Sequence, residues 1–168
     1  VSTALSTTLA VAAETLTAAS AASFTPVTAS GGTSPISFAI SLSLPSGLAI
    51  NASTGAITGT PTASAVSTNY TVTATDANGA TSSKTFALVI NGPLTATQAI
   101  ASTVLTNGTP ASSFTPVTGS GGTAPLSYTV SPGLPSGLSM SSSTGAITGT
   151  PSVTSSATTY TVTVTDAA

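Results

Sequence analysis

The chain has 168 residues, of which 2% are charged, and its formal net charge is −2 at pH 7. Soluble domains usually carry about 25% charged residues, so Ser and Thr hydroxyls must dominate this surface, which lacks the field that attracts nucleic acid or anionic membranes. Neither Cys nor His occurs, which excludes disulfides and the commonest zinc and haem ligands.

The sequence contains an internal repeat. Residues 23–28 and 113–118 both read SFTPVT, and residues 53–61 and 143–151 both read STGAITGTP. The two copies are offset by 90 residues and align without a gap from one motif to the other. Self-similarity at a fixed period is typical of repeat arrays. We therefore expect two tandem domains, residues 1–92 and residues 93–168.

Short strand patterns alternate with turn signals in each repeat. Residues 5–17 align with residues 94–106 at an offset of 89, which predicts a first strand in both copies. Further strands are expected at residues 36–40, 48–50, 56–58, 71–75 and 83–90, separated by turns at residues 30–35, 44–48, 51–55 and 76–79. Turn signals spaced by about 8–12 residues predict a β-sandwich of short strands.

The clearest strands alternate apolar and hydroxyl side chains. Residues 71–75 read TVTAT and residues 161–165 read TVTVT, so each strand buries one face, starting at Tyr70 or Tyr160. In the strand expected at residues 83–90, Phe86, Leu88 and Ile90 stand at alternate positions and therefore lie on one side of the strand. The all-β class follows from these patterns, since no helical periodicity competes with them.

At these residues the chain resembles a known family. The runs LPSGL, STGAITGTP and YTVTxTD are similar to the putative-Ig repeats of bacterial surface proteins, which are similar in turn to dystroglycan-type cadherin-like domains. The resemblance covers nearly the whole chain. It implies two tandem Ig-like β-sandwich domains in an array on a secreted or surface-anchored bacterial protein, with no catalytic site.

The second repeat stops where the last strand of the first repeat would begin. Residues 80–90 have no counterpart after Asp166, so we expect the second domain to lack its last strand within the chain. Either the chain is a slice of a longer array, or a neighbouring chain supplies the strand by β-augmentation. The interface candidates are the possible donor residues Val1, Leu5, Leu9 and Val11 and the acceptor residues Tyr160, Val162 and Val164.

Catalytic and metal-binding chemistry find little support. Catalysis needs paired carboxylates or a nucleophile with a base, and the three acidic residues with a single Lys do not supply them, so we expect no enzyme and no cofactor. Calcium wants six to eight oxygen ligands. Asp76 and Asn78, with Asp166 in the second repeat, are weak candidates, and hydrogen bonding within a turn is the favoured interpretation.

Two functions remain open at this level. The first is an extracellular structural repeat of a filament, sheath or adhesin stalk, whose partners are further copies of the same repeat or chain. The second is a surface module that recognises glycan or ice through Thr-rich strand faces. We expect an extracellular or cell-surface location, no nucleic-acid partner and no membrane span, since no apolar run approaches the ~20 residues that a bilayer requires.

Overall fold

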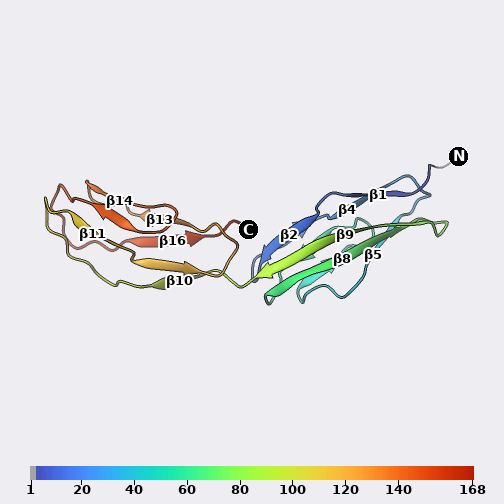
Figure 1. The fold of residues 1–168 in the computed structure, drawn as a ribbon, viewed down its shortest axis with the longest axis horizontal. Helices are drawn as coiled ribbons and strands as arrows, with labels where there is room; N and C mark the ends of the chain where they lie inside the picture. Colours follow the sequence, from blue (N-terminus) through green and yellow to red (C-terminus); the bar gives the residue numbers. More distant parts are fainter. Residues whose placement is uncertain (1–2) are drawn as a thin grey trace. The chain divides into compact units, whose positions relative to one another are not determined.

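A computed structural model describes residues 3–168 as strands, turns and bends. The chain divides into two compact units, unit 1 up to Pro93 and unit 2 from Leu94 to Ala167 (Figure 1). Each unit is a β-sandwich with its own sheets, and no helix occurs among the described residues. The expected all-β class with two tandem β-sandwich units is confirmed.

One layer of unit 1 is a four-stranded sheet built around a long hairpin. Strands β8 (Ala65–Thr75) and β9 (Thr81–Asn91) pair antiparallel across the turn that begins at Asp76. Strand β5 (Ser37–Ile40) pairs with the outer side of β8, and β2 (Ala13–Thr17) pairs parallel with β9. The strand order β2-β9-β8-β5 places β9 in the interior of the sheet.

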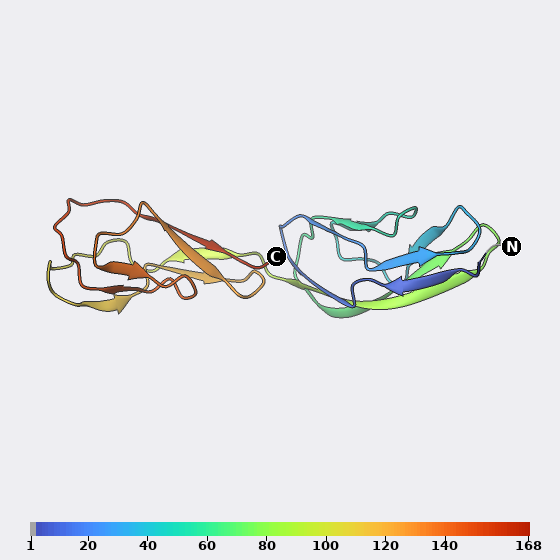
Figure 2. The ribbon, with the colours of Figure 1, turned by 90° about the horizontal axis from the view of Figure 1, so that it is seen from above.

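The other layer of unit 1 consists of two short ladders joined by Pro26. The ladders are β1 (Ser6–Leu9) with β4 (Val27–Ser30), seen in Figure 2, and β3 (Ala22–Phe24) with β7 (Ile57–Gly59) and β6 (Leu48–Ile50). Proline has no N–H to give to a ladder. Pro26 is buried between β3 and β4, and its carbonyl accepts hydrogen bonds from the N–H groups of Ala10 and Val11.

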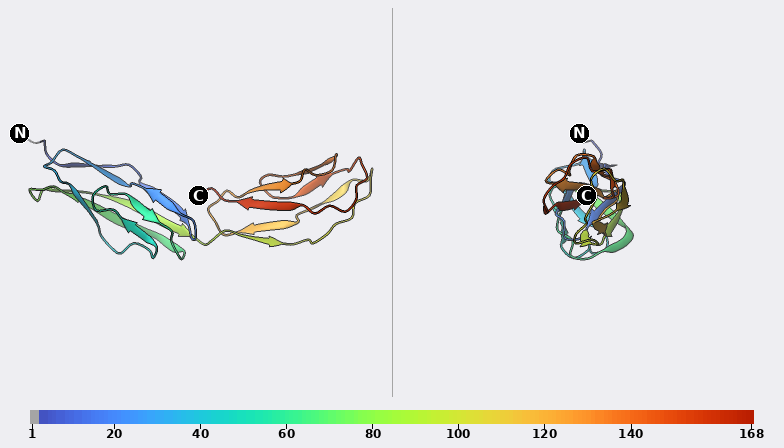
Figure 3. Two further views of the ribbon diagram at one scale, coloured as in Figure 1. Left: turned by 180° about the vertical axis from the view of Figure 1, so that it is seen from behind. Right: turned by 90° about the vertical axis from the view of Figure 1, so that its left-hand side faces the viewer.

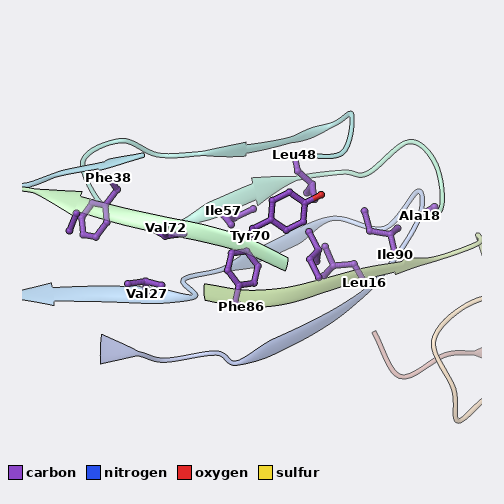
Figure 4. Close-up of a cluster of buried hydrophobic side chains, with 12 residues drawn as sticks. Leu16, Ala18, Val27, Phe38, Leu48, Ile57, Tyr70, Val72, Phe86 and Ile90 are labelled. Carbon is purple, nitrogen blue, oxygen red and sulfur yellow. The ribbon is translucent and has the colours of Figure 1, made fainter. Parts of the chain in front are cut away.

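The core of unit 1 lies between these layers (Figure 4). Phe86 of β9 is 1% exposed, and its ring centroid lies 5.9 Å from that of Phe24 and 5.9 Å from that of Tyr70. Leu88 and Ile90 continue the same face at 1% and 2% exposure. The alternation in the β9 sequence therefore places three large apolar side chains in the centre of the sandwich.

The repeated STGAIT motif forms a turn against this core. The Oδ1 atom of Asn51 accepts hydrogen bonds from the N–H groups of Ser53 and Thr54. Gly55 follows at φ +72°, and a Cβ atom there would lie 3.0 Å from the ring of Phe38. Positive φ and this close approach together require glycine at this position.

Unit 2 repeats the short ladders and keeps only part of the larger sheet. Its pairs are β10 (Thr95–Gln98) with β12 (Val117–Ser120), β11 (Ala111–Phe114) with β15 (Ile147–Gly149) and β14 (Leu138–Met140), and β13 (Ser127–Ser131) with β16 (Thr161–Thr165). Figure 3 shows β16 beside β13. The other side of β16 has no paired strand among the described residues of unit 2.

Candidate functional site

Two segments of unit 2 run without strand pairing where unit 1 has strands. Residues 102–106 correspond to β2, and residues 155–160 correspond to the first half of β8. In unit 1 both segments pair with β9, one on each side. Unit 2 has no counterpart of β9 within residues 94–168, so the two segments lack the strand that would join them.

A groove of about 700 Å³ lies between these two segments of unit 2. It is lined from one side by residues 100–105 and from the other by residues 153–160. Side chains of the core, among them Phe114, Leu138 and Ile147, form its floor, and none of its lining residues is charged. The groove is therefore an uncharged opening into the interior of the sandwich.

The core residues of β16 are less covered than those of β8, because β16 pairs on one side only among the described residues. Tyr70, Val72 and Ala74 of unit 1 are 6%, 0% and 0% exposed. Their counterparts Tyr160, Val162 and Val164, which the sequence singled out as acceptor residues, are only half-buried. Tyr160 and Val162 line the groove. Incompletely covered apolar side chains beside an open strand edge are typical of a surface that pairs with another strand.

The proposed donor residues belong to their own unit. Leu5 and Leu9 pack against the core of unit 1, and Leu9 pairs with Val27 in the β1–β4 ladder. The N–H of Val11 donates to Pro26. In this structure the segment uses its backbone within unit 1, and its action as a possible donor strand stays a prediction. Val1 lies outside the described residues.

The turn residues Asp76 and Asn78 are engaged in local hydrogen bonds. The Oδ2 atom of Asp76 accepts from the N–H of Thr33, and Oδ1 accepts from the N–H groups of Asn78 and Ala80, each at 2.9 Å. The bond from Thr33, followed by that from Ala80, lowers the pKa of Asp76 against the opposing effect of desolvation. The amide of Asn78 donates to the hydroxyl of Thr33 at 2.9 Å.

The calcium candidates do not come together as a site. Asp166 belongs to unit 2, where its Oδ2 atom accepts the N–H of Thr123 at 2.9 Å, as Asp76 accepts that of Thr33. Within the described part of the chain, no three His, Cys, Asp or Glu side chains are grouped as a metal ion would require. The geometry assigns Asp76 and Asp166 to turns, where carboxylates satisfy backbone N–H groups.

Hydroxyl side chains cover the outward face of the β13–β16 ladder. Thr161, Thr163 and Thr165 are exposed, and their cross-strand partners are Ser131, Thr129 and Ser127. In unit 1 the corresponding Thr71 lies across from Thr85, with their Oγ1 atoms 2.9 Å apart. The Thr ladders are therefore regular rows of hydroxyl and methyl groups on a sheet.

The sequence predicted Tyr160 and Val162 as interface residues but missed most of the groove floor and the wall formed by residues 100–105. Leu105, Phe114 and Leu138 line the groove. Phe114 and Leu138 lie in the repeated runs SFTPVT and LPSGL, which indicate a repeat unit and a turn but not a groove. The repeat alignment could have found them, because it matches them to Leu16, Phe24 and Leu48. Leu16 and Leu48 belong to the core that β9 covers in unit 1, and Phe24 packs against that core.

Comparison with known proteins identifies the type of domain. The family model described as Putative Ig domain matches residues 2–91 and again residues 93–168. No curated protein matches the chain. Ig-like domains are typically non-enzymatic structural modules, and the match shows the type of domain alone. No helix among the described residues is long and apolar enough to cross a membrane.

Solved structures with a similar fold include tandem Ig and cadherin domains. The I-band fragment I67–I69 from titin matches at 14% identity with a TM-score of 0.48, covering 84% of this chain. The protocadherin GammaB4 extracellular domain matches at 20% and 0.42, covering 90%, and protocadherin Gamma B2 cadherin domains 3–6 match at 17% and 0.43, covering 97%. The chain spans 53%, 29% and 47% of these three structures.

Proposed function

Because the chain belongs to the Putative Ig domain family over both of its units, we propose that it is an extracellular structural repeat of a filament, sheath or adhesin stalk. The coarser conclusion, that it consists of Ig-like repeats suited to structure or adhesion, rests on the family match and the sandwich fold. The finer role rests on the repetition, the surface and the open sheet.

The observation that carries this proposal is the recurrence of one sandwich design twice in the same chain. The stability of such arrays is approximately a sum of unit and interface terms, so their length can grow by adding units. The two units share the same turn at Gly55 and Gly145, each packed against an aromatic ring. A chain built in this way is better suited to form a stalk or fibre than to bind a small ligand in a pocket.

The nearly uncharged surface supports the same role. With 2% charged residues and a net charge of −2, long-range repulsion between copies is weak. Few charges also leave little for salt to screen. Charge repulsion therefore does little to oppose side-by-side or end-to-end association of copies. The open edge of β16 in unit 2 is one place where strand complementation would join copies head to tail.

Immunogold labelling of the cells that make the protein tests this function. Antibodies against the purified chain should decorate extended material outside the cell, a filament, sheath or surface layer, in thin sections and in whole mounts. Label confined to the cell interior, or spread evenly through the medium without any assembly, would contradict a structural role at the cell surface. Pre-absorption of the antibody with the chain provides the control.

The exposed hydroxyl rows support a second candidate, a module that recognises glycan or ice. Thr161, Thr163 and Thr165 stand at regular intervals opposite Ser127, Thr129 and Ser131. A glycan array and a thermal hysteresis measurement would detect these activities. Thr163→Lys should abolish either one, while Ser143→Lys in an exposed turn should not. No binding and no hysteresis at millimolar protein would eliminate this candidate.

A further inference from the structure

We propose that Asn91 is a site of spontaneous modification, at which the side-chain amide is converted to an aspartyl or isoaspartyl carboxylate without an enzyme. The inference does not depend on the proposed structural function. The chain contains three Asn-Gly pairs, Asn78-Gly79, Asn91-Gly92 and Asn107-Gly108. Among the described residues, the backbone nitrogen that would react makes no hydrogen bond in one pair and is hydrogen-bonded in the other two.

The reaction joins the side chain of an asparagine to the backbone nitrogen of the next residue. That nitrogen loses its proton and attacks the Cγ atom, a C–N bond forms, and the side-chain amide leaves as ammonia. Water then opens the succinimide ring at one of its carbonyls. Opening at Cγ gives Asp, and opening at the main-chain carbonyl gives isoAsp, in which the chain runs through Cβ and Cγ. A following glycine favours ring closure because it has no Cβ atom to obstruct the attack.

The pair Asn78-Gly79 is held in the turn between β8 and β9. The N–H of Gly79 donates to the main-chain carbonyl of Asp76 at 3.0 Å, so the nitrogen that would attack is already engaged. The side-chain amide of Asn78 donates to the hydroxyl of Thr33 at 2.9 Å, and its backbone N–H donates to the carboxylate of Asp76 at 2.9 Å. Hydrogen bonds therefore fix both reacting groups of this pair.

The pair Asn107-Gly108 forms the centre of a turn in unit 2. The N–H of Thr109 donates to the carbonyl of Thr106 at 3.1 Å, which closes the turn around the pair. The N–H of Gly108 donates to the carbonyl of Pro151 at 2.8 Å. Attack by the Gly108 nitrogen would therefore require the loss of a hydrogen bond that connects two segments distant in the sequence.

The pair Asn91-Gly92 lies where β9 ends, and its geometry differs from that of the other two. Gly92 follows the last residue of the strand, and its N–H makes no hydrogen bond to any described residue. A Cβ atom at Gly92 would meet nothing within 4 Å, so there is space for ring closure at this nitrogen. Asn91 itself is half-buried and accepts the N–H of Ala18 at its main-chain carbonyl, at 2.9 Å. The attacking nitrogen is therefore unengaged in this pair alone of the three.

The product differs from the starting chain in its charge and in its backbone. One neutral amide becomes one carboxylate, so the net charge at pH 7 changes from −2 to −3. In the isoaspartyl form the main chain gains one atom, and the carbonyl that accepts the N–H of Ala18 becomes a free carboxylate. Ala18 is 3% exposed. The modification therefore changes a hydrogen bond at the edge of the unit 1 core, in the last residues of that unit.

Peptide mapping of the intact chain after incubation at mildly alkaline pH tests the proposal. Chymotryptic peptides analysed by liquid chromatography and mass spectrometry report Asp and isoAsp at each of the three pairs. In the folded chain, Asn91 should react about tenfold faster than Asn78 and Asn107, the factor that one hydrogen bond contributes. Equal rates at the three pairs, or a slower rate at Asn91, would overturn the proposal.

The same chain unfolded in guanidinium chloride supplies the matched control. Unfolding removes the hydrogen bonds at Gly79 and Gly108, so the rates at Asn78 and Asn107 should rise toward the rate at Asn91. A difference between the pairs that persists unchanged in the unfolded chain would assign it to the neighbouring sequence and would contradict protection by hydrogen bonds.

Two matched substitutions test the assignment to a single residue. Asn91→Gln lengthens the side chain and disfavours ring closure, so it should remove most of the isoaspartate that an isoaspartyl methyltransferase detects in the folded chain. Asn107→Gln, at an exposed position, should leave that signal unchanged. A full signal in Asn91→Gln would contradict the proposal, and peptide mapping of the unsubstituted chain decides the question if this variant fails to fold.

Discussion

At the scale of single residues, Phe86 connects the two layers of unit 1. It lies on β9, is 1% exposed, and contacts the rings of Phe24 and Tyr70. Truncating a buried aromatic side chain removes its transfer free energy and leaves a cavity. We expect Phe86→Ala to lower the free energy of unfolding of unit 1 by about 3–5 kcal/mol, measured by chemical denaturation followed by tyrosine fluorescence.

Val66 provides a matched control in the same sheet. It lies on β8 and is 83% exposed, so Val66→Ala removes little buried surface. Its effect should stay within about 0.5 kcal/mol. Comparable losses from the two substitutions would mean that the β8–β9 hairpin does not carry the core of unit 1.

The hydrogen bonds of Asp76 predict how the stability of unit 1 responds to acid. Its backbone hydrogen bonds, first from Thr33 and then from Ala80, lower its pKa in the folded state. The ionised carboxylate therefore stabilises the fold fully above the ordinary Asp pKa of about 3.9. This contribution fades as the pH falls below that value and is lost once the pH is below the lowered folded-state pKa.

The measurement is the melting temperature of unit 1 between pH 2 and pH 7. The starting protein should lose stability as the pH falls below about 4, and Asp76→Asn should flatten that part of the curve while lowering the melting temperature at neutral pH. The amide can accept at its oxygen alone, whereas both carboxylate oxygens accept in the folded protein. An unchanged pH profile in Asp76→Asn would show that this turn does not set the acid response.

At the scale of elements, the sequence predicts strands well where side chains alternate. The inward set starting at Tyr70 and the β9 set at Phe86, Leu88 and Ile90 were both predicted and are buried as expected. The bounds of β6 were also predicted from its flanking turns. In these segments the local pattern and the tertiary packing favour the same structure.

The first half of β8 could not be predicted, and the reason is visible in the repeat. Residues 65–70 read AVSTNY and residues 155–160 read SSATTY, and neither alternates cleanly. The first is a strand because β9 pairs with it, while the second, without such a partner, is not. The same holds for β2 and residues 102–106. Pairing, and not local propensity, decides these strands, and the groove follows from that dependence.

Hydrogen exchange on the free chain measures this dependence directly. Amides of residues 13–17 and 65–70 should exchange slowly because they pair with β9 in the interior of a sheet. Amides of residues 102–106 and 155–160 should exchange at least about 100-fold faster, because the free energy of local opening should be near zero in these unpaired segments. Similar protection in the two units would mean that residues 102–106 and 155–160 form hydrogen bonds without a β9 equivalent.

At the scale of the whole molecule, each unit has its own sheets and its own apolar interior. The interior of unit 1 is closed by β9, whereas that of unit 2 opens into the groove. In an array, unit stabilities add to interface terms. Two sandwiches of nearly the same design should therefore differ in stability by roughly what one interior strand contributes.

That difference predicts two separate transitions in differential scanning calorimetry. Burying Phe86, Leu88 and Ile90 contributes about 1.5–3 kcal/mol for each side chain, and 1 kcal/mol corresponds to about 4–8 °C for a domain of this size. Unit 2 should therefore unfold more than about 15 °C below unit 1. Phe86→Ala should move only the upper transition, and Ile147→Ala, at a position 5% exposed, only the lower. A single transition shifted by both variants would show that the two units unfold together. It would contradict the prediction that the open groove lowers the stability of unit 2 alone.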